Sequence, residues 1–337
     1  MARRERTTGL PRPRPRATAH SGRRFLGITW NERHGRMAIL AGALALLLTV
    51  GGLFSYRVYY NVIGHPNKVI LTVGNQNFSL RYYSDRLFQF FQANGQTGSS
   101  QPILEQQLLT KIEDEALTIQ VAKDNKISLD DTAITQEIAS ELGVPVGGSG
   151  SSFDTLYRQK LKTTKMSDSN YRTLAEATLA NTKLLDLFKS EVGTTGEEVT
   201  LRTVVRATQA EAAADLTAIK GGQDMGLVAQ KDSTDVTSRQ NDGLMVATPP
   251  SLLDPAVQKL IASKPAGTEL FGPVQVGTSW WIFRIEKRDP KATYSAANQT
   301  QLAQAKLDAA IQAKRSSMKI TTNLTASDIT WAVSHAG

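Results

Sequence analysis

The side chains that most often perform acid–base or nucleophilic chemistry are nearly absent from the main body of this 337-residue chain. The sequence contains no cysteine, and its four histidines are His20, His34, His65 and His335. This composition excludes disulfides, thiolate metal ligands and a cysteine nucleophile. It also excludes a histidine-based acid–base pair or metal site between residues 66 and 334, which removes most hydrolase mechanisms. We expect no cofactor and no metal site.

An apolar stretch near the amino terminus, Met37–Tyr56, divides the chain into two parts. It carries no charge, lacks the polar stripe of a soluble core helix, and has the length of about 20 residues that crosses a bilayer. The run is longer than that of a signal peptide and no small-residue cleavage site follows Gly52, so we expect an uncleaved anchor at 37–56. Arg23–Leu26 faintly resembles a twin-arginine export signal, but charged residues separate it from the apolar run.

The net charge of the chain lies before this stretch. Residues 1–36 hold ten arginines against two glutamates, a net charge of +8 that equals the charge of the whole chain. Positive charge beside a first span stays in the cytoplasm, so we expect residues 57–337 outside. With alternating prolines and arginines, 1–36 is expected to be a disordered cytoplasmic tail. A basic tail can bind nucleic acid, but with a neutral remainder we expect a topology signal and no nucleic-acid partner.

Apolar residues at helical spacing dominate the first part beyond the anchor, after a β-rich run at 68–73. Helices are expected at 80–93, 102–123, 130–142, 153–162 and 167–192. Another helix is expected at 295–319. Because that helix has no core of its own, we expect it to pack on the helices before residue 193. A last short strand is expected to include Ile329 and Trp331.

The pattern changes at the turn-like sequence Gly193–Gly196. Beyond it, we expect strands at 199–205, 271–276 and 280–286, with helices at 209–218, 225–231 and 254–262 and a loop at 233–243. Strands and short helices in this order predict a compact α+β unit.

Three stretches together resemble one protein family. They are 69–87 (VILTVGNQNFSLRYYSDRL), 108–131 (LLTKIEDEALTIQVAKDNKISLDD) and the unit 199–288, with its Ser233-Thr234-Asp235 step, Gly243 and the ending Phe271–Val274 through Trp281–Phe283. In order and spacing these stretches are similar to the membrane-anchored or periplasmic foldases related to SurA and PrsA. The resemblance implies one N-terminal transmembrane helix and an all-α chaperone domain at 66–192, completed by 293–337. It also implies an inserted α+β parvulin-like (PpiC-type) domain at 197–290.

The resemblance further implies a peptidyl-prolyl isomerase pocket. Rotation of an X–Pro bond has a barrier of roughly 18–20 kcal/mol, and lowering it requires a pocket that grips the proline ring and strips water from the imide. Carried over by position, the catalytic polar groups are Asp235 and Thr278. The substrate-binding positions are Leu253, Val257, Thr203 and Trp281. Thr203 and Trp281 replace the two histidines of the family pattern, so the resemblance leaves catalysis undecided.

We therefore expect a membrane-anchored, extracytoplasmic folding factor that binds unfolded exported polypeptides in an apolar cleft between its two domains. Peptidyl-prolyl isomerase activity is the first alternative. A non-catalytic envelope scaffold that binds one specific partner is the second. Client binding requires only burial of exposed apolar side chains and backbone, which gives modest affinity and little sequence specificity.

Overall fold

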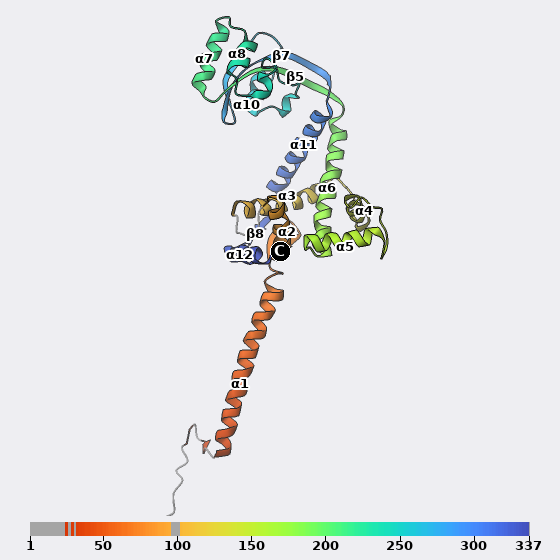
Figure 1. Cartoon of the computed structure of the whole chain (residues 1–337), viewed down its shortest axis with the longest axis vertical. Coiled ribbons are helices and arrows are strands. Elements are labelled where there is room, and N and C mark those ends of the chain that lie inside the picture. The colour runs from red at the N-terminus through yellow and green to blue at the C-terminus, as the bar shows by residue number, and fades with distance from the viewer. Residues whose placement is uncertain (1–23, 26–27, 30–31, 96–101, 337) are drawn as a thin grey trace, which may run out of the picture. The chain divides into compact units, whose positions relative to one another are not determined.

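The computed structural model of the chain describes residues 24–25, 28–29, 32–95 and 102–336. Figure 1 shows its helices and strands. The structure divides into two units, Met1–Pro66 and Asn67–Gly337. The tail predicted to be disordered at 1–36 lies mostly outside the described residues, so its disorder stays a prediction.

The first unit contains the apolar helix. Strands β1 (Arg24–Phe25) and β2 (Ile28–Thr29) precede α1 (Glu32–Tyr59), and a π-helical turn, η1 (Tyr60–Gly64), follows it. Within α1, residues Met37–Tyr56 have a mean hydropathy of 2.3 and none of this stretch is buried. Among the described residues, this helix alone has the length and composition to cross a membrane.

The second unit begins with a group of elements that we call the helical domain. Its helices are α2 (Leu80–Ala93), α3 (Pro102–Asp124), α4 (Asp131–Glu141), α5 (Ser152–Thr164), α6 (Asp168–Val192), α11 (Ala296–Ser317) and α12 (Ala326–His335). Its strands are β3 (Val69–Val73), β4 (Gln76–Ser79) and β8 (Ile320–Thr322), which form an antiparallel sheet in the order β4-β3-β8. The prediction of a strand that includes Ile329 and Trp331 is wrong, because both residues lie in α12.

Polar residues at the helix starts explain why most of these helices begin where the sequence indicates. Ser79, Asp130, Ser167 and Ser295 each accept a hydrogen bond from the backbone N–H three residues on. Such caps satisfy N–H groups that have no partner inside the helix. Helix α12 begins with a capping box between Thr325 and Asp328, which accounts for a helix where we expected a strand.

Helix α11 packs on α6 and α3, although the whole segment 193–295 lies between α6 and α11 in the sequence. Ala303 and Leu307 of α11 are buried in one apolar cluster with Ile119 of α3 and with Leu184 and Phe188 of α6. The sequence predicts this packing from the absence of any other core for α11. The helical domain is thus made from two separate parts of the chain.

The remaining elements form what we call the inserted domain. They are β5 (Thr195–Arg206), α7 (Gln209–Lys220), α8 (Met225–Asp232), α9 (Val236–Arg239), η2 (Pro250–Leu252), α10 (Pro255–Ile261), β6 (Phe271–Val276) and β7 (Ser279–Thr293). The antiparallel sheet has the order β5-β7-β6. One face packs on α10 in a cluster with Phe283 and Val257, and the other packs on α7 and α8 with Val204 and Ile282.

The inserted domain differs from the sequence expectation in two details. Helix α9 lies in the segment 233–243 that we expected to be a loop. Strands β5 and β7 are longer than predicted, because polar residues at their ends pair from Thr195↔Thr293 inward. The predicted layout of an N-terminal apolar helix, a helical domain and an inserted α+β domain is confirmed.

Candidate functional site

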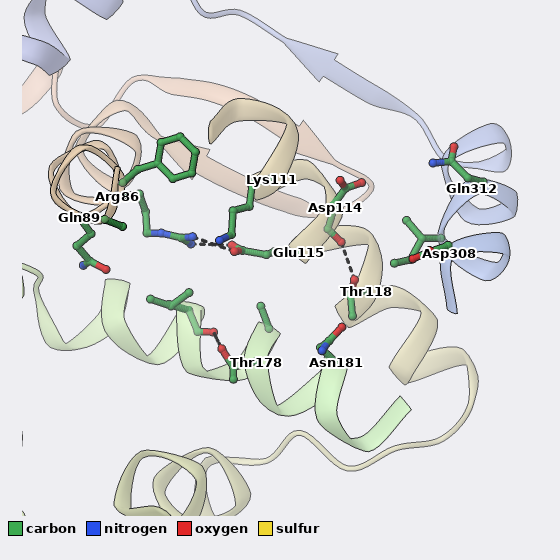
Figure 2. A pocket seen from close by; sticks show the side chains of 15 residues that line it. Arg86, Gln89, Lys111, Asp114, Glu115, Thr118, Thr178, Asn181, Asp308 and Gln312 are labelled. Atoms are coloured by element: carbon green, nitrogen blue, oxygen red, sulfur yellow. Dashed lines mark hydrogen bonds and ion pairs between the residues drawn. The ribbon is translucent and has the colours of Figure 1, made fainter. Parts of the chain in front are cut away.

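A cavity of about 780 Å³ lies within the helical domain, between α2, α3, α6 and α11. Figure 2 shows its lining side chains, which come from all four helices. A volume of this size is in the range of pockets that bind small ligands or several amino-acid side chains. The site therefore depends on the packing of α11 against the earlier helices.

A buried ion pair forms one wall of the cavity. The guanidinium of Arg86 donates to both carboxylate oxygens of Glu115, at 2.6 and 2.8 Å, and also to the hydroxyl of Tyr82 at 2.9 Å. Burial lowers the pKa of Arg86, but the hydrogen bond and charge of Glu115 outweigh burial and raise that pKa above its ordinary value. Burial also raises the pKa of Tyr82 to about 12, so its hydroxyl stays neutral. Arg86 and Glu115 therefore satisfy each other through two charge-assisted hydrogen bonds.

Apolar groups on three walls leave surface that a bound chain can cover. Phe90 of α2, Leu174 of α6 and Ile311 of α11 line the cavity and are only partly buried. Ala93 of α2 and Ala177 of α6 lie among them. Apolar area removed from water contributes roughly 25 cal/mol per Å², so these walls can hold apolar side chains of a flexible segment.

The two residues expected to hold a proline ring, Leu253 and Val257, are part of the core of the inserted domain. Leu253 is 8% exposed and Val257 is fully buried. Both lie in one cluster with Phe271 and Phe283, whose rings stack with centroids 5.2 Å apart. In this packing both side chains contribute to the core of the inserted domain.

Thr203 and Asp235 meet through Ser238, a residue that sequence reasoning missed. The hydroxyl of Thr203 donates to Ser238 Oγ at 3.4 Å, and Ser238 Oγ donates to the carboxylate of Asp235. Asp235 also accepts the backbone N–H of Ser238 at 3.0 Å and thereby caps α9. Thr203 is 1% exposed and Ser238 is 2% exposed. In this arrangement Asp235 is the N-terminal cap of α9.

The remaining two predicted positions lie on one hairpin. Trp281 of β7 is partly buried at the edge of the cluster that contains Leu253 and Val257. Thr278 is exposed in the turn between β6 and β7. The structure thus gathers Trp281 with the two apolar positions, and it links Thr203 to Asp235 separately.

The cavity itself was not found by sequence reasoning, although one signal was present. Arg86 lies three residues after Tyr83 and four before Phe90, which puts a cation on the apolar face of α2. An acid at a corresponding place on a neighbouring helix is the expected partner of such a cation, and Glu115 of α3 is that acid. The other walls come from distant segments and leave no local pattern.

Two family models match the chain, one after the other. Residues 29–185 match the SurA-like N-terminal domain, and residues 183–299 match the PPIC-type PPIASE domain. The two models together cover the helical domain before β5 and the whole inserted domain. The chain belongs to the SurA/PrsA-like foldase family.

Solved structures with similar folds have low identity to the chain. The peptidylprolyl isomerase PrsA from Bacillus anthracis is 15% identical and covers 64% of this chain and 99% of its own, with a TM-score of 0.44. A structure from work on the SurA-like chaperones PEB4 and Cj1289 of Campylobacter jejuni is 16% identical and covers 74% and 96%, with a TM-score of 0.27. No curated protein matches the chain. Since both TM-scores are below 0.5, the family assignment rests on the two domain models.

Proposed function

We propose that this chain is a membrane-anchored, extracytoplasmic folding factor that binds unfolded exported polypeptides and holds them in the cavity of its helical domain. The observation that carries this proposal is the cavity of about 780 Å³, with Phe90, Leu174 and Ile311 on separate walls of a SurA-like domain. Membership of the foldase family and the exposed apolar helix at Met37–Tyr56 support it.

The proposed topology follows from charge and hydropathy. The apolar stretch is the anchor, and the ten arginines before it keep the amino terminus in the cytoplasm. Residues 57–337 then lie outside, where exported chains emerge unfolded. A C-terminal part that resists protease added to intact cells would contradict this topology.

Client holding is tested by blocking the cavity from an exposed position. Thr178 of α6 lines the cavity, and Thr178→Trp places an indole there without removing any buried side chain. We expect the fragment 67–337 to suppress the aggregation of a heat-denatured client, measured by light scattering. We expect that about ten times more of the Thr178→Trp fragment is required for the same suppression.

Thr163→Trp is the matched control, since Thr163 is exposed on α5 and away from the cavity. Each threonine hydroxyl donates to the carbonyl four residues earlier, so both variants lose the same local hydrogen bond. Thr163→Trp should suppress aggregation as well as the unchanged fragment does. Equal suppression by the two variants would remove the cavity from the proposal. Recovery of one stoichiometric partner from membranes, in place of many unfolded clients, would favour the scaffold alternative.

We further propose that the inserted domain has no peptidyl-prolyl isomerase activity, because Leu253 and Val257 are enclosed and both family histidines are replaced. The expected result is an unchanged slow phase in the refolding of a proline-limited substrate at any concentration of the fragment. Proline isomerisation takes tens of seconds, so the phase is easily separated from faster steps. An acceleration that is lost in both Asp235→Ala and Leu253→Ala would establish the enzyme alternative.

A further inference from the structure

The charged side chains that line the cavity differ in how many ion pairs and hydrogen bonds they form within the protein. Both oxygens of Glu115 accept from Arg86, and Asp114 pairs with Arg315 of α11. The carboxylate of Asp308 accepts a hydrogen bond from the side-chain amide of Gln304 at 2.8 Å. Each of these acids is therefore at least partly satisfied within the protein.

The ammonium group of Lys111 differs from these acids because it has no such partner among the described residues. It lines the cavity from α3, it is exposed, and it makes no ion pair or hydrogen bond with another described residue. The acids one turn further along its own helix are Asp114 and Glu115, which Arg315 and Arg86 already hold in ion pairs. Figure 2 shows Lys111 among the side chains that line the cavity. All three donors of its ammonium group remain for a ligand.

We infer that Lys111 binds a carboxylate of the client, so that the cavity prefers segments in which an aspartate or glutamate adjoins apolar residues. The inference rests on the proposed function and names its substrate class. Apolar client side chains cover Phe90, Leu174 and Ile311, and the neighbouring carboxylate pairs with the ammonium group at the α3 wall.

The acids of the cavity limit how much negative charge it accepts. Asp308 is exposed on the α11 wall and Asp114 lies on α3 one turn from Lys111. A run of acidic residues brings more carboxylates toward these two acids than one ammonium group can pair with, whereas a single carboxylate is balanced by Lys111. The preferred segment is therefore apolar with a single acid, and not a polyacidic one.

The experiment uses the full chain in lipid nanodiscs and three fluorescent peptides that differ at one position, which is Glu, Gln or Lys within an apolar sequence. Anisotropy titration should give about fivefold tighter binding of the Glu peptide than of the Gln peptide, the size expected for one partly exposed ion pair. The preference should fall as salt is raised, while the affinity for the Gln peptide changes little.

A charge reversal at the cavity supplies the decisive comparison. Lys111→Glu should reverse the order, so that the Lys peptide binds more tightly than the Glu peptide. Lys162→Glu, at an exposed position of α5 away from the cavity, changes the net charge equally and should leave the preference intact. Equal affinities for the three peptides, or a preference lost equally in both variants, would overturn the role of Lys111 and leave client holding in place. Absence of binding by every peptide would overturn client holding as well.

Discussion

Glu115→Ala is expected to lower the free energy of unfolding of the helical domain by about 3–5 kcal/mol. The side chain of Arg86 is 6% exposed and donates to both oxygens of Glu115. Without the carboxylate, the guanidinium keeps its charge while most of its side chain is shielded from water. Urea unfolding of the fragment 67–337, followed by circular dichroism and by amide hydrogen exchange of α2 and α3, measures the effect.

Glu176→Ala is the matched control, because Glu176 pairs with Lys123 at 3.3 Å and that lysine is 47% exposed. Exposed pairs contribute about 0–1 kcal/mol, so this variant should remain close to the unchanged fragment. Arg86→Met combined with Glu115→Leu removes both charges and should recover much of the loss. A cost below 1 kcal/mol for Glu115→Ala would show that water solvates Arg86 once Glu115 is removed, and would contradict the expected cost of breaking this pair.

Leu307→Ala is expected to cost about 2–5 kcal/mol, the usual loss when a fully buried leucine is cut back and a cavity remains. Leu307 lies on α11 and is fully buried against α3 and α6. Because the fourth wall of the client cavity belongs to α11, the same variant should also weaken client holding. Urea unfolding and the light-scattering assay measure these two effects on one preparation.

Leu302→Ala, at a half-buried position of the same helix, is the control and should cost about 1 kcal/mol. The comparison tests whether residues 293–337 complete the helical domain, as the sequence predicts. Equal small losses for Leu302→Ala and Leu307→Ala would show that α11 does not belong to that core.

The predictable part of the fold is the part encoded by neighbouring residues. Caps such as Ser79 and Ser167 act over three residues, so the sequence marks the starts of α2 and α6 correctly. Strand β8 was missed because its three residues pair with β3, almost the whole length of the second unit away in sequence. Short strands of this kind are defined by their partner and not by their own pattern.

The candidate site was predictable only where a motif could be carried over. Leu253, Val257 and Trp281 do share one cluster, as the family pattern implies. Their burial could not be read from the sequence, because it depends on how Phe271 and Phe283 pack beside them. The client cavity has no motif, since it exists only after α2, α3, α6 and α11 have been brought together.

The strands that lead into and out of the inserted domain are paired from the first residue of β5 and the last residue of β7. Thr195 lies opposite Thr293, and the N–H of Tyr294 donates to the carbonyl of Thr194 at 2.9 Å. Opposite residues of antiparallel strands are only about 5 Å apart, so a turn of a few residues can join them. The whole PPIC-type domain can therefore be lost or exchanged during evolution at this one place in the structure. The helices around the cavity then remain joined and unchanged.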